Sequence, residues 1–179
     1  MHLTIELPNR SETLASNRER WAEVLADREL AVHGYRVETN AFGQVIMTPP
    51  AGGPHSSRQS QIAYWLQNRR GGRGLVECPI STSDGVRAAD VGWYSVERYA
   101  HVRGQLAFEL APEICVEVES PRNTELELRI KRQLYFDAGA QECWQCDLEG
   151  RMSYYLSTDP ETKRNQSTLC PDFPNTIED

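Results

Sequence analysis

Three charged residues that lie far apart in the sequence could together carry metal-dependent chemistry. Asp90 begins one apolar run typical of a strand, Glu117 lies inside a second, and Lys131 lies on an expected helix that follows the second run. Of the 19 basic residues, only two are lysines. Two carboxylates and a lysine form the kind of set that holds Mg²⁺ and activates water for phosphodiester hydrolysis.

The two acids offer the ligand type that hard divalent cations prefer. Mg²⁺ binds one or two carboxylates together with water and phosphate oxygens, so two acids on adjacent strands would suffice. Glu117 lies within 114–118, a run so apolar that an acid there needs a reason. Alternation along this strand puts Glu119 on the same face as Glu117, so Glu119 is a further candidate ligand.

Lys131 could orient the attacking water, help to deprotonate it, or offset charge on the pentacoordinate phosphate. It lies one helical turn from Glu127 and one from Tyr135, which is an accessory candidate. The helix follows the Glu117 strand closely and can return the ammonium to the carboxylates. Simpler explanations also stand: an exposed ion pair with Glu127 for the lysine, a strand-end turn for the first acid and a buried salt bridge for the second.

A sheet and a following helix must position these residues, and the apolar pattern predicts both. Strands are expected at 35–38, 43–48, 75–80, 89–94, 114–119, 143–147 and 152–156, and helices at about 16–30, 55–70 and 124–139. Capping boxes at Ser16–Glu19 and Thr124–Glu127 open the first and third helices. This order predicts an α/β domain with a central mixed sheet flanked by helices. We expect an N-terminal arm at 1–15, the domain at 16–158 and an irregular tail at 159–179.

The composition is that of one soluble domain. The chain has 179 residues, of which 39% are hydrophobic and 25% charged, and no apolar run approaches the roughly 20 residues that cross a bilayer. Its start lacks the features of a signal peptide, so we expect a cytoplasmic protein without a membrane partner. The net charge of −7 argues against nucleic acid, but the acidity lies at the two ends and leaves the segment with the three candidates near neutral.

Other residues invite a functional explanation beside a structural one. Arg69, Arg70 and Arg73, set among glycines, could grip a DNA backbone, although cations at a helix carboxyl end also complement the helix dipole. His55 at the start of a helix could contact a phosphate or serve as a cap. Five cysteines without an export signal do not predict disulfides. One CxxC, at 143–146, leaves a zinc or redox protein as a further interpretation, but a second pair of ligands is not visible.

Several short motifs follow one another over roughly residues 30–158. They are Gly43–Pro50 with the following His55, Arg87–Val91, Glu117–Pro121, Lys131–Tyr135, Gly139, and Glu142–Trp144 with Asp147. In this order they resemble the Uma-type family of predicted restriction endonucleases, which belongs to the PD-(D/E)xK nuclease superfamily. The resemblance implies a restriction-endonuclease-like core, DNA as substrate, Mg²⁺ or Mn²⁺ as cofactor, and a homodimer.

The resemblance also assigns roles. Asp90 would be the acid of the Pro-Asp motif, Glu117 the second metal ligand, and Lys131 the motif lysine moved from the strand to the next helix. The backbone carbonyl of Val118 would complete the metal site.

Two departures from the family pattern affect this assignment. Ala89 replaces the usual proline, which mainly shapes the backbone, and Glu119 stands where the superfamily has lysine. A glutamate at position 119 makes sense only if Lys131 has taken over the role of the motif lysine. Glu119 and the acidic net charge therefore leave an alternative: a catalytically silent protein that keeps the nuclease fold as a binding or scaffold module.

Overall fold

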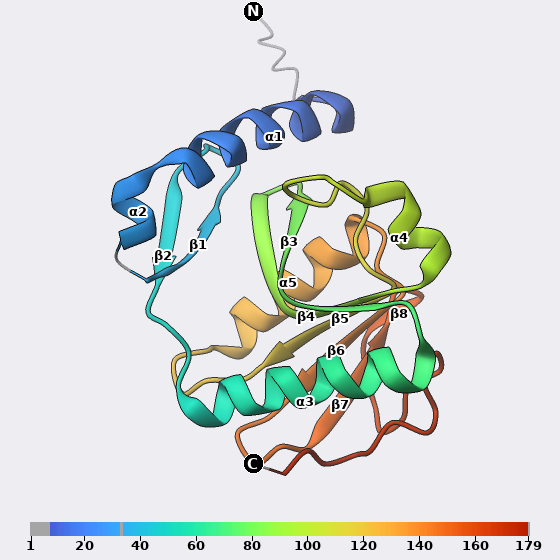
Figure 1. Cartoon of the computed structure of the whole chain (residues 1–179). Helices are drawn as coiled ribbons and strands as arrows, with labels where there is room; N and C mark the ends of the chain where they lie inside the picture. Colours follow the sequence, from blue (N-terminus) through green and yellow to red (C-terminus); the bar gives the residue numbers. More distant parts are fainter. Residues whose placement is uncertain (1–7, 33, 179) are drawn as a thin grey trace, which may run out of the picture.

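A six-stranded mixed sheet forms the centre of the structure (Figure 1). The computed structural model describes residues 8–32 and 34–178. Strands β5 (Ile114–Val118) and β6 (Glu142–Cys146) are parallel, and the other neighbours in the order β3-β4-β5-β6-β7-β8 are antiparallel. The remaining strands of this sheet are β3 (Arg73–Thr82), β4 (Gly85–Tyr94), β7 (Met152–Leu156) and β8 (Asp159–Arg164). The sheet and its flanking helices confirm the fold class predicted from the sequence.

Two helices cover opposite faces of the sheet, α3 (Gly53–Arg70) on one side and α5 (Glu125–Asp137) on the other (Figure 1). The expected capping box opens α5. The Thr124 hydroxyl accepts the Glu127 N–H at 3.2 Å, and the Glu127 carboxylate accepts the Thr124 N–H at 2.8 Å. These bonds fix the start of α5, so its buried face, which includes Tyr135, meets the sheet.

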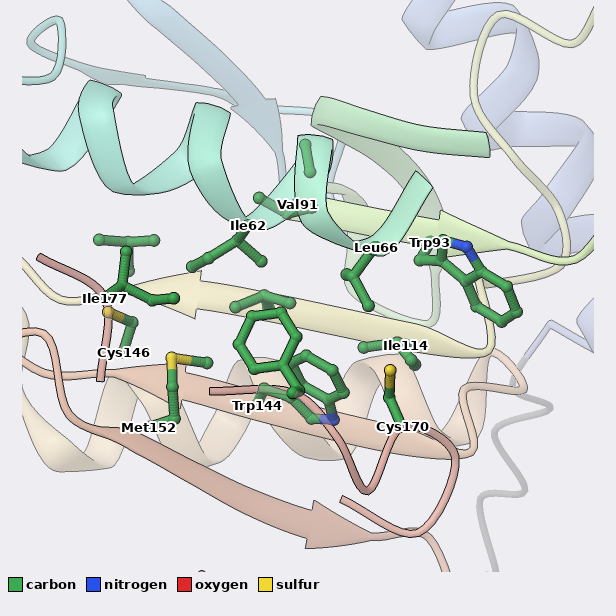
Figure 2. Packing of buried hydrophobic residues seen from close by; sticks show 14 of the residues in the cluster. Ile62, Leu66, Val91, Trp93, Ile114, Trp144, Cys146, Met152, Cys170 and Ile177 are labelled. Carbon is green, nitrogen blue, oxygen red and sulfur yellow. The ribbon is translucent and has the colours of Figure 1, made fainter. Parts of the chain in front are cut away.

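The larger core cluster lies between α3 and the sheet (Figure 2). Ile62 and Leu66 of α3 are fully buried against strand residues such as Ile114, and burying each such side chain contributes roughly 1.5–3 kcal/mol. Farther along the sheet, the rings of Trp144 and Phe173 lie 4.7 Å apart. The segment after β8 adds three residues to this core, namely Cys170, Phe173 and Ile177. The C-terminal segment therefore covers part of the sheet.

The expected hairpin is a separate two-stranded sheet of β1 (Arg36–Thr39) and β2 (Val45–Thr48). It docks on β4 through buried polar groups, because Glu38 and Thr39 each accept a main-chain N–H of β4 at 2.9 Å. Buried polar groups need such partners, so the docking position is specific. The hairpin is thereby held against β4, the strand that carries Asp90.

The first helix begins earlier than predicted. Helix α1 spans Arg10–Ala26, and its capping box is formed by Asn9 and Glu12. The expected capping box at Ser16–Glu19 is therefore wrong, and these residues lie within the helix. Asn17, in the middle of that pattern, is buried and donates its side-chain amide to β3 at 2.8–2.9 Å. The polar side chain of Asn17 therefore holds α1 against β3 and does not mark the start of a helix.

The end of the expected first helix forms a separate short helix, α2 (Arg28–Val32), and the elements that the sequence pattern did not predict are α4 (Val96–Val102) and β8. The C-terminal segment expected to be irregular thus begins with a strand, which pairs with β7. The N-terminal arm falls partly on residues 1–7, outside the described residues. The boundaries of the arm, domain and tail remain a prediction.

The CxxC cysteines lie on different sides of β6. Cys143 belongs to the core cluster beneath α5, and Cys146 belongs to the cluster beneath α3; both are buried free thiols. Because they point to opposite faces of the sheet, they cannot bind one zinc ion together, which contradicts the zinc interpretation.

No helix in the described ranges has the length and apolar character needed to span a membrane.

Candidate active site

The pairing of β4 with β5 brings Asp90 and Glu117 together. Val91 lies opposite Val116 in this antiparallel pair, so the next positions along the strands are Asp90 and Glu117. Residues opposite each other project from the same face of a sheet. Both acids are buried, at 1% and 7% exposure. The N–H of Val118 donates to Asp90 Oδ2 at 2.6 Å and ties the first acid to the strand of the second.

Helix α5 adds a lysine and a tyrosine to the two acids. Lys131 Nζ donates to Glu117 Oε2 at 3.0 Å and to the carbonyl of Ala88 at 3.2 Å. The hydroxyl of Tyr135, one turn later, donates to Glu117 Oε1 at 2.6 Å. Lys131 is therefore turned inward, and the exposed ion pair with Glu127 is not its main interaction, since Glu127 caps the helix.

The protonation states of the two acids differ. Burial would raise the pKa of Asp90, but the hydrogen bond from His55 and the charge of Arg36 lower it to about 2. Burial raises the pKa of Glu117, Lys131 opposes this and Asp90 adds to it, and the result is about 7. Burial alone would lower the pKa of Lys131, yet Glu117 raises it above its ordinary value. The lysine therefore stays a cation at neutral pH.

A second acid on the hairpin holds the same lysine. Glu38 Oε1 lies 3.2 Å from Lys131 Nζ, and Glu38 Oε2 lies 3.3 Å from Arg87 Nη1. Burial would raise the pKa of Glu38, but Lys131 and Arg36 lower it, so Glu38 stays ionised. Sequence analysis missed Glu38 because a short hairpin strand gives no signal of where it docks.

Arg36 brings a second cation to the cluster. Its Nη1 lies 2.5 Å from Asp90 Oδ1 and its Nε lies 2.8 Å from Glu77 Oε2. Nη2 also donates to the carbonyl of Ala88. Arg36 and Glu38 share a face of β1, so their alternation was visible in the sequence, but nothing in it showed that this face meets the carboxylates.

Glu77 occupies a strained position beside Asp90. Its φ is 50°, and among the described residues no other non-glycine residue has a positive φ. The β3–β4 pairing skips this position, with Val76 and Cys78 paired on either side. Gln59 of α3 donates to Glu77 Oε1 at 2.7 Å and to the Asp90 carbonyl at 3.0 Å. Such strain persists only where the surroundings enforce it, and it occurs often at functional sites.

These groups line a large cavity, of about 1510 Å³. Its walls come from the hairpin, the loop before α3, the start of α3, the segment after β5 and α5. Asp90, Glu117, Val118 and Lys131 all line it, as does His55, whose Nε2 lies 3.3 Å from Asp90 Oδ2. The structure thus gathers around one cavity the predicted catalytic residues, the carbonyl-bearing residue of the proposed metal site and two accessory residues, His55 and Glu119.

Glu119 lines the same cavity but belongs to a different electrostatic group. It follows the end of β5, and burial raises its pKa with help from Asp147, Glu125 and Glu149. None of these acids is part of the cluster around Glu117. The expectation that Glu119 is a metal ligand remains a prediction.

The three arginines expected to contact DNA lie elsewhere. Arg69, Arg70 and Arg73 are at the carboxyl end of α3 and just after it, whereas His55 is at the other end of this helix, about 27 Å long. They do not belong to the cavity lining, and each stacks over an aromatic ring with a centroid distance of 5.7–5.9 Å. Any DNA contact by these residues would be separate from the cavity.

The donor set in the cavity fits a hard divalent cation. Two carboxylates project from adjacent strands, and each oxygen of Glu117 accepts one hydrogen bond, which leaves a lone pair on each. Burial is the largest cause of the raised pKa of Glu117, so a bound cation would favour its ionised form. Within the described ranges, no three His, Cys, Asp or Glu side chains are arranged to hold a metal ion alone. Water and phosphate oxygens would have to complete the coordination, as is usual for Mg²⁺.

Comparisons with known proteins identify the family of this chain and a solved structure with a similar fold. A family model described as "Uma2: Putative restriction endonuclease" matches residues 22–176. No curated protein matches the sequence. Among solved structures, the fold is similar to a protein from Anabaena variabilis described as "a putative nuclease belonging to DUF820", with a TM-score of 0.58 and 21% sequence identity over 70% of this chain and 73% of that one.

Proposed function

Because the chain belongs to the Uma2 family, we propose that it is a metal-dependent endonuclease that hydrolyses phosphodiester bonds in DNA. The family description supports a nuclease. The observation that carries the finer proposal is the convergence of Asp90, Glu117 and Lys131 from β4, β5 and α5, with Lys131 Nζ 3.0 Å from Glu117 Oε2 at the cavity wall. Magnesium is the proposed cofactor, and manganese would serve in its place.

The metal would be held by the carboxylates of Asp90 and Glu117 and by the main-chain carbonyl of Val118. When bound, it supplies a polarised water and neutralises charge on a phosphoryl oxygen. Lys131, as a protonated amine, orients the attacking water and offsets the charge that develops on phosphorus. It does not act as the base, because its pKa is raised by Glu117.

Two neighbours position these groups. Tyr135 holds Glu117 Oε1 through its hydroxyl, which fixes the carboxylate orientation. His55, in the first turns of α3, contacts Asp90 and lines the cavity, so it can also donate to a substrate phosphate. By the same resemblance that suggested DNA, the active form is proposed to be a homodimer.

The test uses supercoiled plasmid and single-stranded DNA with Mg²⁺ or Mn²⁺. Lys131→Ala is expected to cut at least about a hundredfold more slowly than wild type, because a donor to developing charge is lost. The chain offers a matched control in its other lysine: Lys163→Ala removes an exposed lysine of β8 and should cut at the wild-type rate. Equal cutting by wild type and Lys131→Ala would refute the lysine's role.

The competing proposal is a catalytically silent binding or scaffold module. Its support is that Asp90 Oδ1 is already paired with Arg36. Calorimetric titration separates the two proposals. Binding of Mg²⁺ or Mn²⁺ that is lost in Asp90→Ala favours the enzyme, whereas no metal affinity in the wild type favours the silent module.

A further inference from the structure

Arg36 places a permanent positive charge against the oxygen that a metal would use. Its guanidinium contacts Asp90 Oδ1 at 2.5 Å, and guanidinium groups stay charged in proteins. A Mg²⁺ ion on the same oxygen would sit about 2.1 Å from it. The two cations cannot share this oxygen closely without strong repulsion, since like charges at such distances in a buried site are poorly screened.

The surroundings of Arg36 leave it room to move. It is the first residue of β1 and pairs with Thr48, the last residue of β2, so it lies at the open end of the hairpin. Its side chain is 20% exposed and lines the cavity, whereas the side chain of Asp90 is 2% exposed. The acid is fixed by Val118 N–H and cannot follow the arginine. If the contact between Arg36 and Asp90 opens, it is therefore Arg36 that moves.

Glu77 provides an anchor for the displaced arginine. Its carboxylate lies 2.8 Å from Arg36 Nε, on the side of the guanidinium away from the Nη1 that meets Asp90. Gln59 holds Glu77 through its other oxygen. The guanidinium can leave Asp90 while its Nε keeps this ion pair, and in doing so its Nη2 gives up the hydrogen bond to the Ala88 carbonyl.

We propose that Arg36 is an internal counter-ion that competes with the divalent cation for Asp90 and thereby sets the metal affinity of the site. This inference rests on the proposed function, because it takes Asp90 as a metal ligand. It assigns Arg36 a positioning role: the residue keeps Asp90 ionised and correctly oriented until a cation binds, and it must leave Asp90 Oδ1 for binding to occur.

The test is calorimetric titration with Mn²⁺ alone, comparing wild type, Arg36→Gln and Arg87→Gln. Arg87 lines the same cavity and is as buried, but it pairs with Glu38 and Asp84 and does not contact Asp90. Arg36→Gln should bind Mn²⁺ at least about tenfold more tightly, since a like charge is removed from the ligand. Arg87→Gln should change the affinity much less, because the charge that it removes lies against Glu38 and Asp84 and not against the proposed metal ligand.

A second measurement uses the wild type and does not depend on the folding of a variant. Phenylglyoxal modifies accessible arginines, and mass spectrometry of the peptides reports each site. Saturating Mn²⁺ should speed the modification of Arg36 and leave that of Arg87 unchanged. Equal modification rates of Arg36 with and without Mn²⁺ would overturn the proposal.

The outcomes separate this inference from the proposed function. If the wild type binds Mn²⁺ and cuts DNA but Arg36→Gln binds no more tightly, or gains no more than Arg87→Gln, the counter-ion role is wrong and the endonuclease stands. If only Arg36→Gln binds, Arg36 does compete, and the wild type is the silent module. If none of the proteins binds Mn²⁺, both proposals fail.

Discussion

Glu117 and Glu142 are buried glutamates on neighbouring parallel strands, yet they are satisfied in opposite ways. Glu142 is 1% exposed and accepts only neutral donors in the hydrogen bonds described. These are the Trp144 indole N–H, the Ser167 hydroxyl and the N–H groups of Thr168 and Leu169, at 2.6–2.8 Å. Glu117 instead meets a lysine, a tyrosine and a second carboxylate, and it lines the cavity.

The difference separates a structural acid from the acid that we propose to bind metal. Glu142 ties the C-terminal segment to β6 and completes a polar cluster away from the cavity lining. Its burial is explained by its hydrogen bonds alone. Glu117 lies beside a second carboxylate and a cation and faces the cavity, which is a costly arrangement for a buried acid. A buried acid therefore indicates chemistry only when its partners are charged and the space before it is open.

Glu117→Gln is expected to have the largest effect. The amide keeps the shape but binds metal poorly, so DNA cleavage should fall by at least about a hundredfold, as for loss of other groups that stabilise developing charge. The free energy of unfolding should stay the same or rise at pH 8, because the repulsion from Asp90 is removed. Plasmid cleavage and urea unfolding measure the two quantities. Full activity of Glu117→Gln would show that Glu117, like Glu142, has only a structural role.

Glu142→Ala should show the reverse pattern. Four donors lose a common acceptor, so the free energy of unfolding should fall by about 2–3 kcal/mol. Cleavage at low temperature, where the variant remains folded, should match the wild type because Glu142 does not line the cavity. Urea unfolding followed by tryptophan fluorescence reports the first effect. A loss of cleavage in the folded variant would contradict the structural role.

The smaller effect is a pH dependence of stability that comes from Glu117. Burial raises its pKa to about 7 in the folded protein, above the value of 4.5 for an unperturbed glutamate. The folded state thus holds the proton more tightly than the unfolded state. The resulting contribution to the free energy of unfolding is present at pH 4.5 and is lost as pH rises to about 7. Without metal, the wild type should lose on the order of 2 kcal/mol relative to Glu117→Gln between pH 5 and pH 8. If the free energies of unfolding of the two proteins changed in parallel with pH, the pKa of Glu117 would not be raised in the folded protein.

Local signals predicted the elements that carry the candidate residues. The apolar run of β5, the glycine after α3 and the capping box at Thr124 each act over a few residues, and the structure has these elements close to the expected positions. The same capping pattern misplaced the start of α1, because Asn9–Glu12 and Ser16–Glu19 both satisfy it and only packing of Asn17 on β3 decides between them. Strand β8 was missed because it contains a proline, and its other residues are polar or charged and do not alternate with apolar ones.

The candidate site was only partly visible in the sequence. The order of Asp90, Glu117 and Lys131 could be read because each lies in or next to a recognisable element. Arg36 and Glu77 could not, since their roles depend on where a separate hairpin docks and on one strained backbone position. Such long-range contacts leave no periodic pattern in the chain.

The central claim is that Asp90 holds a metal that the hydrolysis of DNA requires. Its most direct test is the cleavage of supercoiled plasmid by wild type and Asp90→Asn, each with Mg²⁺ and with EDTA, after circular dichroism has shown that both are folded. We expect the wild type to cut only with Mg²⁺ and Asp90→Asn to leave the plasmid intact. Cleavage by Asp90→Asn at the wild-type rate, or by the wild type in EDTA, would contradict the account.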